Sequence, residues 1–190
     1  VKNYEKSLTI KPDYAEAHNN LGNVLRELNQ LDSAIKSYKQ ALSIKTDFAE
    51  AFNNLGIALK ELGQLDTAVM SYEQVLTINP GLVEAHNNLG ITLQELGQHD
   101  AAVKSFEKAL VIKPDYVDAH RNLGISLQEL GQLDKAVKSY EKAIAINPGF
   151  ANTHYNLGLT FQELGQHDAA VKSYEQALAI KPDFAEAHNN

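Results

Sequence analysis

The sequence predicts an all-α solenoid of antiparallel helix pairs, and three regularities support this prediction. Almost every residue of the segment 83–116 returns 34 positions earlier and 34 positions later. Within that period a Leu-Gly pair, an alanine and an aromatic residue keep fixed places. Glycine and proline also recur where helices are expected to end. A fixed period of this length is typical of a stacked array, in which each repeat packs only against its neighbours.

Four ladders of residues define the period. The leucines of the Leu-Gly pairs are Leu21, Leu55, Leu89, Leu123 and Leu157. The alanines are Ala34, Ala68, Ala102, Ala136 and Ala170, and the aromatic residues are Tyr38, Tyr72, Phe106, Tyr140 and Tyr174. The prolines are Pro12, Pro80, Pro114, Pro148 and Pro182, with Thr46 in the one gap.

On these residues the whole chain resembles the tetratricopeptide repeat (TPR) family. A TPR unit has Leu-Gly in its first helix, alanines and an aromatic residue in its second helix, and proline at its end. The resemblance implies a right-handed superhelical solenoid whose first helices line a concave groove.

The period also divides the chain into repeats. If position 1 is placed at Ala15, complete TPR units span 15–48, 49–82, 83–116, 117–150 and 151–184. Residues 1–14 then form the second helix of a truncated repeat, and residues 185–190 form the start of another. Since no polar capping element is visible at either end, we expect a segment of a longer array, unless disordered ends continue the chain.

The first helix of each unit is expected at positions 1 to 14. An aspartate precedes it in four places and an acidic residue follows three positions later, for example Asp47 and Glu50, which suits a capping box. The helix should end at a residue with left-handed backbone, namely Asn29, Gly63, Gly97, Gly131 or Gly165.

The second helix should begin near Asp32, Asp66, Asp100, Asp134 or Asp168, where a carboxylate favours the helix dipole, and should stop before the proline. In the third unit its buried face would include Ala102, Phe106 and Ala109. Gly90 lies in the middle of the first helix, so we expect a close helix contact that a methyl group would obstruct, assisted by these two small alanines.

The outward face of the first helix is not uniformly polar. Position 9, at its centre, is Asn23 in the first unit and then a large apolar residue, giving Ile57, Ile91, Ile125 and Leu159. An apolar row on an otherwise polar surface often marks a partner site. The alternative is that neighbouring first helices shield these side chains.

Beside this apolar row stands an asparagine at position 6 of every unit: Asn20, Asn54, Asn88, Asn122, Asn156 and, in the last partial unit, Asn190. A carboxamide can both donate to and accept from an extended backbone. The ladder resembles that of the superhelical TPR arm of peptide O-GlcNAc transferase, whose asparagines hold the main chain of a bound polypeptide. Bonding between adjacent repeats, or to water, is the structural alternative. Position 5 varies and would tune selectivity, through Asn19, Asn53, Asn87, Arg121 and Tyr155.

Charge on this face indicates the type of partner. Acidic residues, among them Glu61, Glu95 and Glu129 at position 13, outnumber the basic Arg26, Lys60 and Arg121. An acidic lining attracts basic ligands, so a neutral to basic peptide with apolar anchors is expected. Glutamate and asparagine at positions 2 and 5 argue against the TPR units that clamp acidic C-termini with Lys and Arg.

Other classes of function find little support. A net charge of −7 disfavours nucleic acid and anionic membranes as partners, and no apolar run is long enough to span a membrane. There is no cysteine, phosphate loop or catalytic triad, so we expect no enzyme, cofactor or metal site. Five of the seven histidines share position 4, a packing place, and we interpret them as structural. No signal peptide is visible, and we expect a cytoplasmic protein.

We therefore predict a protein–protein interaction scaffold that binds a polypeptide along its concave groove. Two alternatives remain open: the substrate-selecting arm of a larger enzyme such as a glycosyltransferase, and a structural array that stacks end to end.

Overall fold

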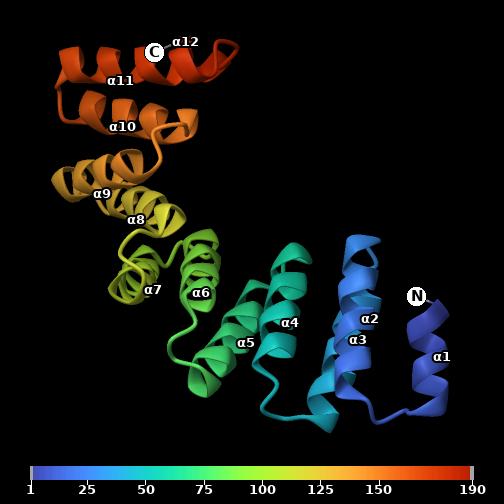
Figure 1. Cartoon of the computed structure of the whole chain (residues 1–190). Helices are drawn as coiled ribbons and strands as arrows, with labels where there is room; N and C mark the ends of the chain where they lie inside the picture. The colour runs from blue at the N-terminus through green and yellow to red at the C-terminus, as the bar shows by residue number, and fades with distance from the viewer. Residues whose placement is uncertain (1, 189–190) are drawn as a thin grey trace. The chain divides into compact units, whose positions relative to one another are not determined.

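The computed structural model describes residues 2–188 and folds them into α-helices joined by short loops (Figure 1). No strand occurs among these residues. Within each of the two units described below, consecutive helices pack against each other as antiparallel pairs, so the predicted all-α solenoid of helix pairs is confirmed. Asn190, the last member of the asparagine ladder, lies outside the described residues. The chain divides into two compact units, Val1–Leu96 and Gly97–Asn190, which are described separately.

Unit 1 contains six helices among its described residues. They are α1 (Lys2–Ile10), α2 (Ala15–Glu27), α3 (Leu31–Ile44), α4 (Ala49–Glu61), α5 (Leu65–Ile78) and α6 (Val83–Glu95). Each helix from α2 to α5 packs against the helices before and after it, and the first helices α2, α4 and α6 also touch in succession.

Unit 2 repeats this arrangement with six more helices in its described part. They are α7 (His99–Ile112), α8 (Val117–Glu129), α9 (Leu133–Ile146), α10 (Ala151–Glu163), α11 (His167–Ile180) and the short α12 (Ala185–His188). The first helices α8 and α10 contact each other here as well.

No side-chain capping hydrogen bond forms at the start of α2, α4 or α8, so the prediction of capping boxes at these helices was wrong. The residue at the N-cap of α4 is Phe48, one position after Asp47, and its side chain makes no capping hydrogen bond. Phe48 is buried, and the Lys45 ammonium lies 4.8 Å from the centroid of its ring. Burial of Phe48 therefore fixes the backbone at the start of α4. Asp47 lies one residue before the N-cap position, which is too early for its side chain to cap the first free N–H groups of the helix.

The predicted ends of the first helices are confirmed. Gly63, Gly97, Gly131 and Gly165 have φ between 68° and 78°, and Asn29 has φ of 57°. After α4, Gln64 N–H donates to Leu59 C=O at 2.9 Å, and Gly63 N–H donates to Lys60 C=O at 2.9 Å. This pair of bonds is the Schellman motif, which satisfies carbonyl groups that the helix leaves free.

The core of each pair forms around an aromatic residue of the second helix. Tyr38, Tyr72, Phe106 and Tyr140 are fully buried. The Tyr72 ring lies against Gly56, where an added Cβ would come within 2.8 Å of ring atom Cε1. The close contact expected at the mid-helix glycine is therefore present, but a tyrosine ring rather than small alanines occupies the space at this position.

Candidate functional site

The apolar row of position 9 lies on the outward face of the first helices. Ile57 on α4, Ile91 on α6, Ile125 on α8 and Leu159 on α10 are all half-buried. Because the first helices contact one another within each unit, neighbouring side chains shield part of each residue. Each keeps an accessible edge, so shielding is real but incomplete.

In unit 1, asparagines of this face bond from one repeat to the next. Asn54 Nδ2 donates to Asn19 Oδ1 at 3.0 Å, and Asn19 Nδ2 donates to Glu50 Oε1 at 2.9 Å. Asn19 is only 1% exposed. These three side chains tie α2 to α4, so inter-repeat bonding occupies part of the hydrogen-bonding capacity of the asparagine ladder.

The corresponding bond is longer at Asn88 and is not formed by Asn156. Asn88 Nδ2 lies 3.5 Å from Asn53 Oδ1, at the outer limit of a hydrogen bond. In unit 2, position 5 is Arg121, whose Nη2 turns to Asp118 Oδ1 at 3.2 Å. The half-buried side-chain amide of Asn156 consequently makes no hydrogen bond to the preceding repeat within residues 2–188.

Other predicted residues of the site differ in accessibility. Asn87 and Asn122 are buried and hydrogen-bonded or otherwise paired, whereas Asn20 is half-buried. Tyr155 packs its ring against Tyr174 and Phe184, with centroids 5.8 Å and 5.0 Å away. Tyr155 thus belongs partly to the core, although it remains half-exposed.

A shallow pocket of about 350 Å³ brings two predicted residues together in unit 2. Tyr155 and Asn156 line it together with Asn152, Lys181, Phe184 and Glu186. The pocket offers an aromatic wall and an amide that makes no hydrogen bond to another repeat within residues 2–188. This combination is suited to holding one side chain and one peptide group of an extended segment.

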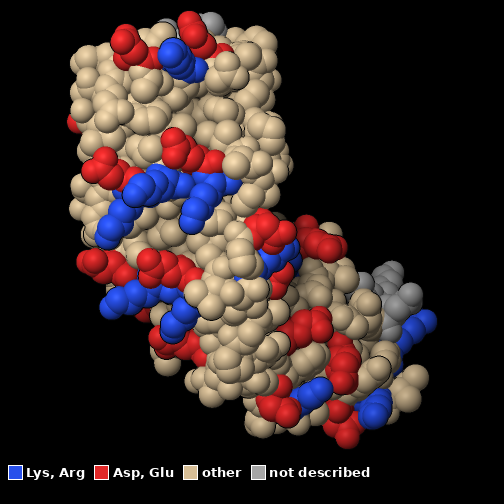
Figure 2. Space-filling view, turned by 60° about the vertical axis from the view of Figure 1, so that its left-hand side comes forward, with Lys and Arg blue, Asp and Glu red and all other residues tan. Residues whose placement is uncertain are grey.

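The row of glutamates at position 13 is exposed but partly paired. Lys60 Nζ lies 3.3 Å from Glu95 Oε1, and Gln128 Nε2 donates to Glu163 Oε1. Glu61 and Glu129 have no cationic partner within 4 Å in the described chain. The negative field along the first helices is therefore smaller than the sequence count suggests. On the face drawn in Figure 2, acidic and basic atoms lie in mixed clusters between uncharged surface.

Sequence reasoning missed the tyrosine hydroxyl groups, which reach this face from the second helices. Tyr38 donates to Asn23 Oδ1 at 2.9 Å, and Tyr174 donates to Gln162 Oε1 at 2.8 Å. Burial raises the pKa of Tyr38 to about 12, so its hydroxyl stays protonated and can act as a donor. The sequence signal that could have indicated these bonds is a polar residue at position 9 or 12 of the same 34-residue repeat, such as Asn23 or Gln162.

The position 4 histidines fasten the turns between repeats. The Nε2 atoms of His18, His86, His120 and His154 lie 2.8–3.1 Å from the carbonyl oxygen of the proline six residues earlier. The ring nitrogen donates and the proline carbonyl accepts. Where Thr46 replaces proline, Phe52 replaces the histidine, so that turn has no such bond. No group of three metal-ligating side chains assembles among residues 2–188.

No helix in the described part of the chain has the length and apolar character needed to cross a membrane.

Comparison with protein-family models gives matches over most of the chain. A model described as tetratricopeptide repeat matches three times, over residues 47–115, 81–149 and 115–183, and a second model with this description matches residues 3–36. A model described as TPR repeat matches residues 22–63. A comparison with curated protein sequences found no match.

Solved structures share the architecture. YrrB, described as a TPR protein with an unusual peptide-binding site, superposes with a TM-score of 0.83 at 24% identity, covering 98% of this chain and 96% of its own. A MamA structure gives a TM-score of 0.82 at 29% identity, over 87% and 96% of the two chains. MamA from Desulfovibrio magneticus RS-1 gives 0.84 at 22% identity, over 90% and 97%.

Proposed function

The chain belongs to the tetratricopeptide repeat family, whose arrays are protein-interaction scaffolds, and on that premise we propose that it binds an extended polypeptide along its first-helix face. In unit 2 this face runs over Ile125, Leu159 and Asn156. In unit 1 it runs over Ile57, Ile91 and the amide of Asn54. The proposed ligand is neutral to basic and carries apolar anchors.

The observation that supports this proposal most strongly is the pairing of an accessible carboxamide with accessible apolar edges. The Asn156 amide makes no inter-repeat bond within the described chain and lies in the pocket beside Tyr155. Ile125 and Leu159 leave a half-exposed row next to it. A peptide could bury those edges and pair a backbone group with the amide. Full burial of one such side chain contributes about 1.5–3 kcal/mol and a net amide hydrogen bond about 0.5–1.5 kcal/mol, so the apolar row would dominate affinity.

Charge would act mainly on encounter and selectivity. Glu61 and Glu129 are exposed and have no cationic partner within 4 Å among the described residues, and an exposed ion pair contributes only about 0–1 kcal/mol. We therefore expect basic peptides to bind faster at low salt, with affinity still depending on apolar residues. A peptide-binding site is described for YrrB on the same fold, and at 24% identity that likeness supports the architecture alone.

The test is a binding selection from a random-sequence displayed peptide library, using the whole chain. The variant changes Ile125 and Leu159 to Asn, the residue that Asn23 already places at this repeat position. The matched control changes Val171 and Ile180 to Asn, since both are exposed on the second helix α11. Thermal melting first establishes that both variants are folded.

The proposal expects that peptides selected by the wild type lose at least tenfold in affinity for the first-helix variant and keep their affinity for the control. Equal loss in the two variants, or selected peptides that bind both as tightly as the wild type, would move the site away from the first helices.

A further inference from the structure

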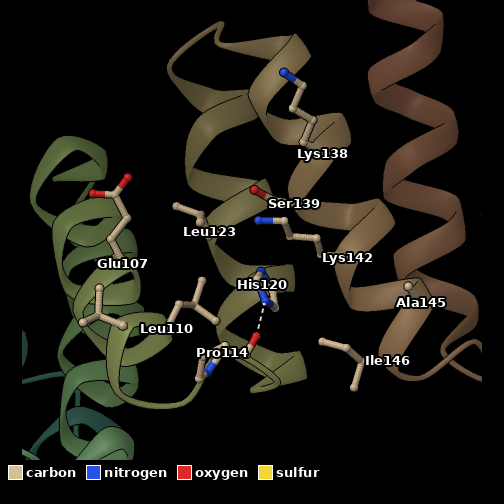
Figure 3. A pocket seen from close by; sticks show the side chains of 11 residues that line it. Glu107, Leu110, Pro114, His120, Leu123, Lys138, Ser139, Lys142, Ala145 and Ile146 are labelled. Atoms are coloured by element: carbon tan, nitrogen blue, oxygen red, sulfur yellow. Dashed lines mark hydrogen bonds between the residues drawn. The ribbon is translucent and has the colours of Figure 1, made fainter.

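A second concave feature lies in unit 2, on the side of the second helices. A groove of about 790 Å³ opens between α7 and α9, and α8 forms its floor (Figure 3). His120 and Leu123 on the floor point to the side of α8 opposite Arg121 and Ile125. The groove is therefore separate from the first-helix face proposed above.

The floor and walls of the groove are largely apolar. Leu110 and Val111 from α7, Leu123 from α8 and Ile146 from α9 line it. Val111 is 83% exposed and Ile146 is 41% exposed, so water covers large apolar side chains here. The volume falls within the range of about 300–1,000 Å³ that is usual for ligand sites.

Positive charge lies along the α9 wall. Lys138 and Lys142 are one helical turn apart, both line the groove, and neither has a carboxylate within 4 Å in the described chain. Figure 3 shows the Lys142 side chain extending from α9 toward α8, above His120, while Glu107 stands on the α7 wall. Burial, with the Lys142 ammonium nearby, lowers the pKa of His120, so the cationic groups near neutral pH are the two lysines.

This groove departs from the repeat at the two positions that shape it. At the repeat position of Lys142, three other 34-residue repeats have glutamine: Gln40, Gln74 and Gln176. At the repeat position of Val111, the other complete repeats have smaller residues: Ser43, Thr77, Ala145 and Ala179. Among the complete 34-residue repeats, only 83–116 and 117–150 bring a valine at the repeat position of Val111 next to a lysine at the repeat position of Lys142. The fold requires neither residue.

We propose that the α7–α9 groove binds a short acidic peptide in which a bulky apolar side chain is flanked by carboxylates. The apolar side chain packs on Leu110, Val111 and Ile146 above Leu123, and the carboxylates pair with Lys138 and Lys142. Glu107 repels carboxylates from the α7 wall, which orients the peptide with its acidic groups toward α9. Since the whole chain carries a net charge of −7, binding of an acidic ligand depends on this local pair of lysines.

Fluorescence anisotropy with the whole chain tests the proposal. The probe is a labelled capped peptide with one leucine between two glutamates, and its matched competitor has lysines in place of the glutamates. Lys142→Gln restores the residue that other units have, and Val111→Ser does the same for the apolar wall. The control is Lys108→Gln, which removes the same charge at the same repeat position of α7 but outside the groove lining.

The expected result is saturable binding of the glutamate peptide that weakens about threefold in Lys142→Gln and about tenfold when Lys138→Gln is added. Val111→Ser should weaken binding about threefold to tenfold, and Lys108→Gln should leave it unchanged. The proposal is overturned if the wild type does not bind the peptide, if the lysine peptide binds as well, or if Lys108→Gln weakens binding as much as Lys142→Gln. A last competition uses the fatty acid decanoate. If decanoate displaces the peptide while Lys142→Gln leaves peptide binding unchanged, the proposal is also overturned, because an apolar site without the lysine contact would explain both results.

Discussion

The ring of Tyr140 lies so close to Gly124 that a Cβ atom added at Gly124 would come within 2.6 Å of ring atom Cε1. The tyrosine is fully buried, and its hydroxyl donates to Gln128 Oε1 at 3.3 Å on the outward side of the same first helix. One aromatic side chain thus joins the second helix to the first helix and reaches the candidate binding face.

We predict that Gly124→Ala destabilises the chain by about 1–3 kcal/mol, because the ring must shift in a packed core. This result is opposite to the intrinsic helix propensity, which favours alanine over glycine by about 1 kcal/mol. The free energy of unfolding from urea titration measures it. Gly81→Ala is the control, since an added Cβ there meets no atom closer than 3.6 Å. Equal stability of Gly124→Ala and the wild type would show that the ring moves at no cost.

A second prediction concerns the one turn without proline. Lys45, before Thr46, has φ of −128° and ψ of 97°, close to the values of −134° and 87° for Asn79 before Pro80. The Thr46 N–H group donates no hydrogen bond within the described chain. Thr46→Pro should therefore stabilise the fold by about 0.4–1 kcal/mol by restricting the unfolded chain. Thermal melting should show an increase of about 1–4 °C.

The reverse exchange is the matched control for the proline prediction. Pro80→Thr introduces the residue that the first complete repeat already has at Thr46. This substitution should lower the melting temperature by a similar amount. A decrease with Thr46→Pro would mean that the backbone at this turn does not match that of the other units.

The sequence predicted helices and their ends well because these depend on local chemistry. Gly63 and Asn29 have the left-handed backbone expected from their residue types. The division into 34-residue repeats and the peptide-binding role of the site residues stay predictions. The sequence allows the asparagine ladder to bond either between repeats or to a ligand, because a carboxamide has several candidate partners and only the spacing between helices selects the bond between Asn19 and Asn54. The groove beside Lys142 could not be predicted either, because it depends on how far α7 and α9 stand apart over α8.

Acidification should destabilise the chain through His120. Burial is the main cause that lowers its pKa below the usual value of about 6.5, with the Lys142 ammonium adding to it and the bond to the Pro114 carbonyl opposing it. The unfolded state then binds a proton at higher pH than the folded state does. Stability from this group is complete above about pH 6.5 and falls as the pH drops below that value, until His120 is charged in the folded state too.

The measurement is the urea midpoint of the wild type and of His120→Phe at about pH 7.5 and about pH 5.5. Phe52 shows that a phenyl ring is accommodated at this repeat position. The variant should lose less stability on acidification than the wild type. His167→Gln, at an exposed position of α11, should keep the wild-type dependence. An identical pH dependence in wild type and His120→Phe would assign the effect to other groups.

The asparagine ladder allows structure and binding to be separated, because its members differ in what they already hold. Asn19 is buried and makes two side-chain bonds, to Glu50 and Asn54, so Asn19→Ala should lower the free energy of unfolding by about 1–3 kcal/mol. Asn156 makes no inter-repeat bond in the described chain, so Asn156→Ala should change the free energy of unfolding by no more than about 0.5 kcal/mol.

The two substitutions then give a clear criterion for the ligand. Urea titration gives the stability of each variant, and affinity is measured for a peptide selected by the wild type. If Asn156→Ala weakens binding while stability stays constant, the lost free energy belongs to a contact with the ligand. If only Asn19→Ala affects binding, and it does so in proportion to its loss of stability, the ladder acts by holding α2 and α4 together. In that case the apolar row alone would contact the peptide. The affinity for the peptide should then not change when an asparagine without an inter-repeat bond, such as Asn156, is replaced.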